Sequence, residues 1–356
     1  MRRPSEDDRK HKLRSKLHRS RSVERIANAQ HKRRRVKLAT KARRNSPYTA
    51  RLKICSVVAI AFWGVHAIAA CSDEGKTAQT AATQFSPLGE ASLSFYKLRK
   101  SPKVEWKLPN RLSEISGLAA TPDGRILAHN DEQAIIYEID IDEGEIVKSF
   151  RLGPSGIKAD FEGIAIAEES IFLVTSRGTL YEAVEGDQDE AVEYATYDTG
   201  VGDVCEVEGL EYEPLERTLL LACKTTHGSR LKDGVAIFRW SIENRRLSER
   251  DLIWISEDEI KRHLPQKQFH PSGIARHPAT GTYLIISARE HALIEVTPRG
   301  KIVAVENLKS GRHRHAEGIT VRQRKSGAFD LLISNEGGDR RARIARYRDR
   351  SRKKND

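Results

Sequence analysis

The stretch EVEGLE, residues 206–211, places two glutamates two positions apart and follows the second one directly with a glycine. Similar openings recur as EISGLA (114–119), DFEGIA (160–165), HPSGIA (270–275) and HAEGIT (315–320). The five motif glycines are 46, 46, 64 and 45 residues apart. Repeats of this length indicate a fold built by stacking one supersecondary unit, because a single unit cannot bury its own faces.

Each glycine is followed by a similar series of short apolar segments separated by turns. In the first repeat these segments are SGLAA, RILAHND, AIIYEID and EIVKSFRL, with the turn TPDG (121–124) after the first. Four short antiparallel strands in about 45 residues make one blade of a β-propeller. We therefore predict an all-β propeller of five four-stranded blades. Six blades are the alternative, if residues 93–113 and 241–269 contain another one.

The fifth repeat stops near Tyr347, before any fourth strand. The segment LSFYKLRKSPKVEWKLP (93–109) precedes the first repeat and has strand character, so we expect it to complete the last blade and close the ring. The third repeat is the longest and contains SEDEIKRHL (256–264). Ser256 and Glu259 form a capping box there, which predicts a short helix between two blades.

The net charge of +12 belongs to the N-terminal part of the chain. Residues 1–53 contain 20 Lys or Arg and four Asp or Glu, so the remaining residues carry a net charge of −4. A basic leader can bind RNA or anionic lipid, but we interpret it as a solvated topogenic tail. The high pI therefore gives no reason to expect that the folded part binds a specific nucleic acid.

An apolar run, ICSVVAIAFWGVHAIAA (54–70), follows the leader and precedes Cys71. Its length suits a short membrane span or a long signal sequence, and the basic flank is expected to stay in the cytoplasm. IAAC resembles a lipobox, so Cys71 is a lipidation candidate. We expect a periplasmic propeller, either on an inner-membrane signal-anchor or as a lipoprotein. The predicted parts are leader 1–53, anchor or lipoprotein signal 54–71, tether 72–92, propeller 93–349 and tail 350–356.

Carboxylates gather before the motif glycines, where the innermost strands should begin at one mouth of the central tunnel. Positions three and one before the glycine point the same way in an extended chain. Like charges this close need compensation, and Ca²⁺ suits many oxygen ligands. His270 and His315, which occupy the third position before their glycines, could instead favour Zn²⁺ or another transition metal. The candidate metal ligands are Glu114, Asp160, Glu162, Glu206, Glu208, His270, His315 and Glu317.

The second strand of each repeat should return to the same mouth. The ends of these second strands include three cations, Arg177, Lys224 and Arg289. They leave two further interpretations open: an ion-pair ring that only closes the tunnel, or a clamp for an anion. These interpretations can overlap, because a metal and cations together often hold phosphate or carboxylate. The candidate ligand-binding residues at the ends of these strands are Asn130, Asp131, Arg177, Lys224, Arg289, Asn335 and Glu336.

Two cysteines of the third repeat, Cys205 and Cys223, should lie at this mouth. They form a disulfide in an oxidising compartment or stay as two buried thiols. His129 and His227 lie near the same face as candidate bases. The sequence has no G-x-S-x-G elbow, H-E-x-x-H pair or Walker loop. The catalytic residues of any enzyme function are therefore not predicted.

The elements SGLA…PDG…IYEID (116–140), FEGIA (161–165) and AEGIT (316–320) resemble the SdiA-regulated (YjiK-like) proteins, a group that includes the calcium-regulated β-propeller protein. The resemblance covers roughly residues 93–348. It implies an envelope-associated propeller with a link to calcium and a poorly defined biochemical activity.

Three functions follow as expectations. The first is a monomeric binding or signalling module that holds Ca²⁺ and a small-molecule or protein ligand at the acidic mouth. The second is a metal-dependent hydrolase, either a lactonase or a phytase-like phosphoesterase. The third is a protein-docking scaffold with a structural ion-pair ring.

Overall fold

The computed structural model describes residues 91–227, 231, 233–248, 252–265, 268–338 and 340–350. The predicted leader, membrane segment, Cys71 and nearly all of the tether lie outside these residues, as does most of the tail. Within the described ranges, no helix has the length and apolarity that a membrane span requires.

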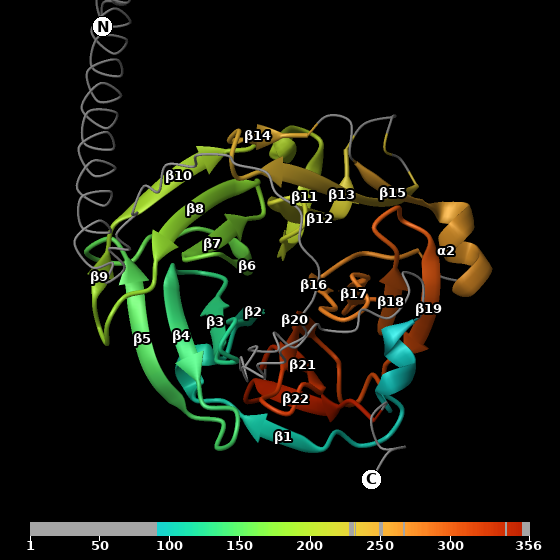
Figure 1. Cartoon of the computed structure of the whole chain (residues 1–356), viewed down its shortest axis with the longest axis horizontal. Coiled ribbons are helices and arrows are strands. Elements are labelled where there is room, and N and C mark those ends of the chain that lie inside the picture. The colour runs from blue at the N-terminus through green and yellow to red at the C-terminus, as the bar shows by residue number, and fades with distance from the viewer. Residues whose placement is uncertain are drawn as a thin grey trace, which may run out of the picture. The chain divides into compact units, whose positions relative to one another are not determined.

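Five sheets, antiparallel except for one short added strand, surround a central axis, so the prediction of a five-bladed propeller is confirmed (Figure 1). Blades 1 and 2 come first in the chain, and each is given from its inner to its outer strand. Blade 1 contains β2 (Ile115–Ala120), β3 (Ile126–Asn130), β4 (Ile135–Ile139) and β5 (Ile146–Leu152), with β9 (Ala191–Val192) added parallel to β5. Blade 2 contains β6 (Phe161–Ala167), β7 (Ser170–Thr175), β8 (Thr179–Val184) and β10 (Tyr194–Asp198).

The other three blades follow the same order. Blade 3 contains β11 (Cys205–Glu213), β12 (Thr218–Thr226) and β13 (Gly234–Ser241), with β14 (Arg246–Leu247) and β15 (Ile253–Ser256) both paired to β13. Blade 4 contains β16 (Gly273–Arg276), β17 (Tyr283–Ser287), β18 (Ala292–Val296) and β19 (Ile302–Asn307). Blade 5 contains β20 (Ala316–Gln323), β21 (Phe329–Asn335), β22 (Arg343–Arg348) and β1 (Val104–Lys107). The 241–269 region thus supplies the outer edge of blade 3, not a sixth blade.

The ring closes as predicted, because β1 pairs antiparallel with β22. The segment before β1 differs from the strand expected there: Ser92–Phe95 form a 3-10 helix, η1. The backbone amides of Ser92 and Leu93 each donate to the buried Glu295 carboxylate at 2.8 Å, and Ser92 Oγ donates to it at 2.7 Å. Because Glu295 lies on β18, the N-terminal segment is fastened to blade 4 while its strand completes blade 5.

The predicted short helix is also confirmed, as α2 (Glu257–His263), between blades 3 and 4. Ser256 Oγ accepts a hydrogen bond from the Glu259 amide at 3.2 Å, which satisfies one of the free donors of the first turn. Ile260 is buried and belongs to the apolar cluster that packs between these two blades.

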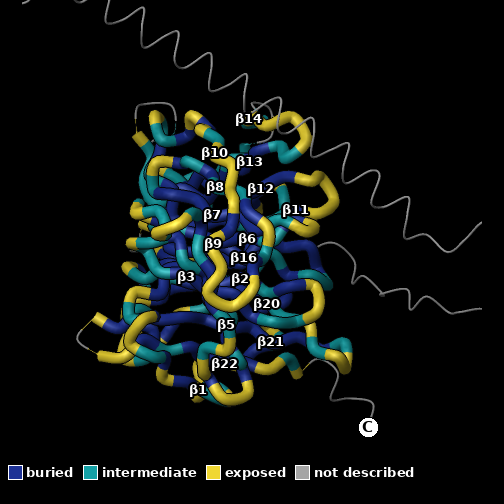
Figure 2. Tube along the Cα trace, turned by 90° about the vertical axis from the view of Figure 1, so that its left-hand side faces the viewer, coloured by how far each residue is buried: buried dark blue, intermediate teal, exposed yellow. Residues whose placement is uncertain are grey.

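Apolar side chains fill the space between the faces of neighbouring sheets. Figure 2 shows the buried trace running through the middle of the molecule, with the exposed positions mainly in the connecting loops. The inner strands approach one another closely: a Cβ on Gly163 of β6 would lie 2.6 Å from the Leu210 amide nitrogen of β11. The motif glycine is therefore needed where two blades meet at the axis.

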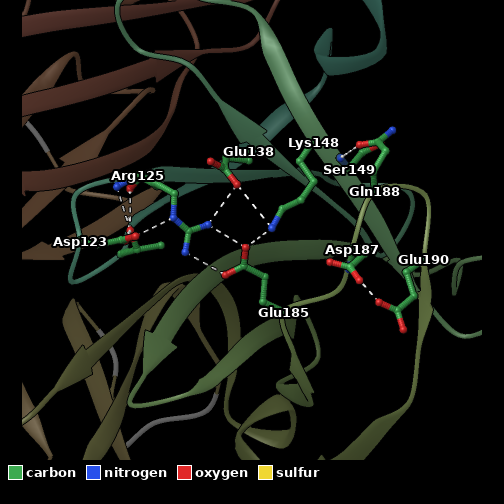
Figure 3. Close-up of polar contacts among 10 residues, drawn as sticks. Asp123, Arg125, Glu138, Lys148, Ser149, Glu185, Asp187, Gln188 and Glu190 are labelled. Carbon is green, nitrogen blue, oxygen red and sulfur yellow. Dashed lines mark hydrogen bonds and ion pairs between the residues drawn. The ribbon is translucent and has the colours of Figure 1, made fainter.

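Charged side chains join blades 1 and 2 on the face where β3 begins (Figure 3). The guanidinium of Arg125 donates to both oxygens of Glu185, at 2.7 and 3.0 Å, and to Glu138 at 3.0 Å. Lys148 also pairs with Glu185. These hydrogen bonds from Arg125 and Lys148 lower the pKa of Glu185, although its partial burial opposes this. Two blades that share a core are thus also joined electrostatically at their edge.

Candidate functional site at the tunnel mouth

The inner strands begin, and the second strands end, at one face of the propeller, which we call the mouth. Hydrogen bonds join the two sets of residues in several blades. The Ser176 amide donates to the Asp160 carbonyl at 2.9 Å, and the Glu336 amide donates to the His315 carbonyl at 2.9 Å. In blades 2 and 5 the start of the inner strand thus lies beside the end of the second strand.

Glu162 and Glu208 lie on the neighbouring inner strands β6 and β11, and we call them the acidic pair. Glu208 is buried, and Lys224 Nζ donates to its Oε1 at 2.6 Å. Glu162 receives a 3.2 Å hydrogen bond from Ser116 Oγ of blade 1. Burial, followed by the charges of Glu208 and Asp160, raises the pKa of Glu162 well above its ordinary value. Burial also raises the pKa of Glu208, although Lys224 opposes this.

Carboxylates from blades 1 and 5 extend this acidic region. Burial, then the charges of Glu208 and Glu336, raises the pKa of Glu317 to about 7. Burial, then the charge of Glu114, raises the pKa of Asp131 to about 6, with Glu336 contributing. Carboxylates from blades 1, 2, 3 and 5 therefore interact electrostatically across the mouth.

The three predicted cations differ in whether they form ion pairs with carboxylates. Lys224 Nζ lies 2.6 Å from Glu208 and 3.7 Å from Glu206. Arg289 is exposed, 3.8 Å from Glu290. Arg177 is exposed too, and within the described part of the chain no carboxylate lies within ion-pair distance of it. The cations thus do not form a closed ring with the mouth carboxylates.

Among the described residues, no hydrogen bond or ion pair joins either predicted histidine ligand to Glu162 or Glu208. His270 Nδ1 is 2.9 Å from Glu290 Oε1, and its backbone amide donates to Glu290 Oε2 at 2.9 Å. His315 is exposed. Both line a hollow of about 430 Å³, together with Lys224, Arg289 and Glu317. Among the described residues, no three His, Cys, Asp or Glu side chains are arranged as a preformed metal site.

Buried oxygen atoms without donors lie at the ends of the second strands of blades 1 and 5. Asn130 Oδ1, Asp131 Oδ1 and Asn335 Oδ1 have no hydrogen-bond partner within the described ranges. The amide of Asn130 is oriented by its Nδ2, which donates to the Arg111 carbonyl at 2.7 Å. An unsatisfied buried acceptor costs roughly 1–3 kcal/mol, so these oxygens favour a bound cation or donor.

The candidate bases are poorly placed for chemistry. His129 is completely buried, its Nδ1 lies 2.8 Å from the Asn130 carbonyl, and burial lowers its pKa to about 4. Its ring occupies the space that a side chain at Gly117 would need. His227 is exposed directly after β12, the second strand of blade 3, and no contact orients its ring within the described residues.

A disulfide joins Cys205 of β11 to Cys223 of β12, with the two Cα atoms 5.7 Å apart. These strands also carry Glu206, Glu208 and Lys224, so the bond fixes the backbone beneath the acidic pair. Thr225 Oγ1 additionally donates to Glu206 Oε2 at 3.1 Å.

Sequence reasoning missed Thr225 and Glu290. Thr225 directly follows the predicted cation Lys224, and regular strand alternation would place the two on opposite faces. The β11–β12 register is shifted near this point, so the alternation pattern gave no signal for Thr225. Glu290 follows the end of β17, outside the aligned positions, so the repeat pattern gave no signal for it.

Solved structures that are similar to this chain include three proteins with low sequence identity. *Myxococcus xanthus* glutaminyl cyclase is similar over 70% of this chain and 95% of its own, at 15% identity and a TM-score of 0.49. A luciferin-regenerating enzyme is similar over 68% and 94%, at 7% identity and a TM-score of 0.44. Virginiamycin B lyase from *Staphylococcus aureus* is similar over 68% and 72%, at 14% identity and a TM-score of 0.36.

No curated protein matches the chain. The model of the SdiA-regulated family, in contrast, matches residues 101–326, which span all five inner strands and most of the ring. The match covers more than half of the chain. The chain belongs to the SdiA-regulated family.

Proposed function

We propose that this protein is an envelope-associated binding module whose tunnel mouth holds a divalent cation, with Ca²⁺ as the first candidate. The observation that carries the proposal is the convergence of Glu162, Glu208 and Glu317 from three blades around one paired lysine, Lys224. Burial and then the charge of Glu208 raise the pKa of both Glu162 and Glu317. A cation at this place would stabilise the ionised carboxylates.

The oxygen atoms available there suit a hard cation. Ca²⁺ takes 6–8 oxygens, and it accepts amide as well as carboxylate oxygens. Asn130 Oδ1 is an amide oxygen without a donor in the described part of the protein. Since no preformed metal cluster is present among the described residues, the proposal includes movement of the glutamate side chains towards the ion. Such movement lowers the affinity, because the glutamate side chains lose conformational freedom when they close on the ion.

A binding role fits these residues better than a hydrolase. A hydrolase needs a base near the metal, and the buried His129 and the unoriented His227 do not provide one. A purely structural plug fits less well too, because among the described residues neither Arg177 nor Arg289 forms an ion pair with Glu162. We further propose that residues 54–71 attach the propeller to the inner membrane, with lipidation of Cys71 as the alternative.

The test is calorimetric titration of Ca²⁺ into the chelator-treated full-length protein. The Glu162→Gln/Glu208→Gln variant should bind at least about tenfold more weakly, a loss of about 1.4 kcal/mol. A matched control, Glu169→Gln/Glu243→Gln, changes the charge equally at two exposed positions and should bind like the wild type. Absence of saturable binding by the wild type, or equal binding by the mouth variant with an unchanged circular dichroism spectrum, contradicts the proposal.

A further inference from the structure

A second hollow, of about 380 Å³, lies beside the acidic mouth in blade 5. The connection from β19 to β20 and the turn after β21 both contribute to its lining. Arg314 and His315 line both this hollow and the 430 Å³ one, so the two adjoin. Five arginines line the blade 5 hollow, against one described carboxylate, that of Glu336: Arg312, Arg314, Arg340, Arg341 and Arg343.

The arginines differ in how far the protein already uses them. Arg343 pairs with Glu105 at 3.2 Å, and Arg312 makes contacts of 3.3 and 3.4 Å with Lys100 and Ser101. Within the described ranges, Arg314, Arg340 and Arg341 have no carboxylate at ion-pair distance. Three guanidinium groups at one hollow can therefore bind an anion. A bound anion would also reduce the electrostatic repulsion among the three positive charges.

Both sides of the hollow are held in place by buried contacts. His313 is buried; its Nε2 lies 2.7 Å from Tyr347 Oη and its Nδ1 lies 3.2 Å from Asn335 Nδ2. On the other side, the Gly337 amide donates to the Ser113 carbonyl at 2.8 Å. A Cβ on Gly337 would lie 2.2 Å from the Arg340 carbonyl oxygen, so the turn that presents Arg340 requires glycine there. Contacts at His313 and at Gly337 thus hold the backbone on the two sides of the hollow.

The arrangement of several guanidinium groups around one hollow favours a phosphate ligand over a carboxylate ligand. A planar carboxylate is satisfied by one guanidinium fork, whereas the three terminal oxygens of a phosphomonoester accept from several. Asn335 is 5% exposed, lines the hollow, and has an Oδ1 without a donor in the described part of the protein. An acceptor beside a cationic site suits a ligand that carries a hydroxyl donor next to its phosphate.

We propose that the blade 5 hollow binds a phosphomonoester that carries neighbouring hydroxyl groups. Arg314, Arg340 and Arg341 hold the phosphate, and Asn335 accepts a hydrogen bond from a hydroxyl. This site is distinct from the proposed cation site and does not depend on it. A soluble sugar phosphate and a phosphomonoester lipid headgroup share the chemistry, and the experiment separates these two sources.

The test uses the full-length protein in excess chelator, so that its outcome is independent of cation binding. Glucose 6-phosphate, ethyl phosphate and glucose are titrated calorimetrically. Vesicles of phosphatidylcholine, with and without phosphatidylinositol 4-phosphate, whose headgroup carries hydroxyl groups beside a phosphomonoester, are tested by cosedimentation. We expect glucose 6-phosphate to bind more tightly than ethyl phosphate, and glucose not to bind.

Arg340→Gln/Arg341→Gln should weaken binding at least about tenfold, because two phosphate contacts are lost. The matched control Arg246→Gln/Arg299→Gln removes two exposed arginines elsewhere and should bind like the wild type. Binding of the phosphatidylinositol 4-phosphate vesicles alone, with the same dependence on Arg340 and Arg341, supports the site and assigns the lipid source. No binding of any phosphate probe, or equal weakening by both variants, overturns the proposal.

Discussion

Lys224 Nζ donates to Glu208 Oε1 at 2.6 Å, and this contact joins the second strand of blade 3 to its own inner strand. The disulfide between Cys205 and Cys223 lies on the same two strands. Lys224 also lies within reach of Glu206, at 3.7 Å. A tethered ammonium therefore occupies part of the region in which we propose a cation, and the two compete for the same oxygens.

Replacing Lys224 by methionine tests this competition. Lys224→Met keeps an apolar side chain of similar length but leaves the buried Glu208 without its donor. We expect the free energy of unfolding near neutral pH to fall by roughly 1–3 kcal/mol without divalent cations, and Ca²⁺ to restore part of it. Urea denaturation with chelator and with Ca²⁺ measures both effects. Lys261→Met breaks an exposed pair with Glu257 on α2 and should change little; an equal loss in both variants would contradict the prediction.

Glu317 should make stability fall as pH rises. Burial, then Glu208 and Glu336, raises its pKa from an ordinary value of 4.5 to about 7. Between these values the folded protein keeps a proton that the unfolded chain has lost, so stability decreases through that window and levels off above it. Glu317→Gln removes this dependence and should be more stable than the wild type at pH 8, by at most about 3 kcal/mol.

Urea denaturation at several pH values from about 5 to 8 measures the slope for both proteins. Glu169→Gln changes an exposed carboxyl on blade 2 and should keep the wild-type slope. If Glu317→Gln also keeps it, then Glu317 titrates normally in the folded protein.

The sequence predicted the ring well because its evidence is repeated. Five glycine motifs report the same inner strand, and the truncated fifth repeat indicates that β1 must close blade 5. The N-terminal 3-10 helix had no such signal. Ser92–Phe95 is fixed by Glu295, which is about two hundred residues away and lies outside every aligned position.

The mouth was predicted less completely, because the repeat defines backbone positions and not side-chain partners. His270 occupies an aligned position but contacts Glu290, which precedes the third strand of its own blade. The arginine hollow in blade 5 comes from connections that differ between repeats, so alignment gave no reason to combine Arg314 with Arg340. Whether Cys205 and Cys223 form a disulfide was likewise open until their distance was known.

The inner-strand glycines give the sharpest test of the fold itself. A Cβ on Gly163 would lie 2.6 Å from the Leu210 amide nitrogen, which is backbone and cannot rotate away. Gly163→Ala must therefore push two blades apart, and we expect a loss of roughly 1–3 kcal/mol, as for overpacked cores. Gly311→Ala is the matched control, since nothing lies within 4 Å of the added Cβ. It should stay within about 0.5 kcal/mol of the wild type. Urea denaturation of the three proteins measures these differences, and equal stability of the two variants would mean that the inner strands do not pack this closely.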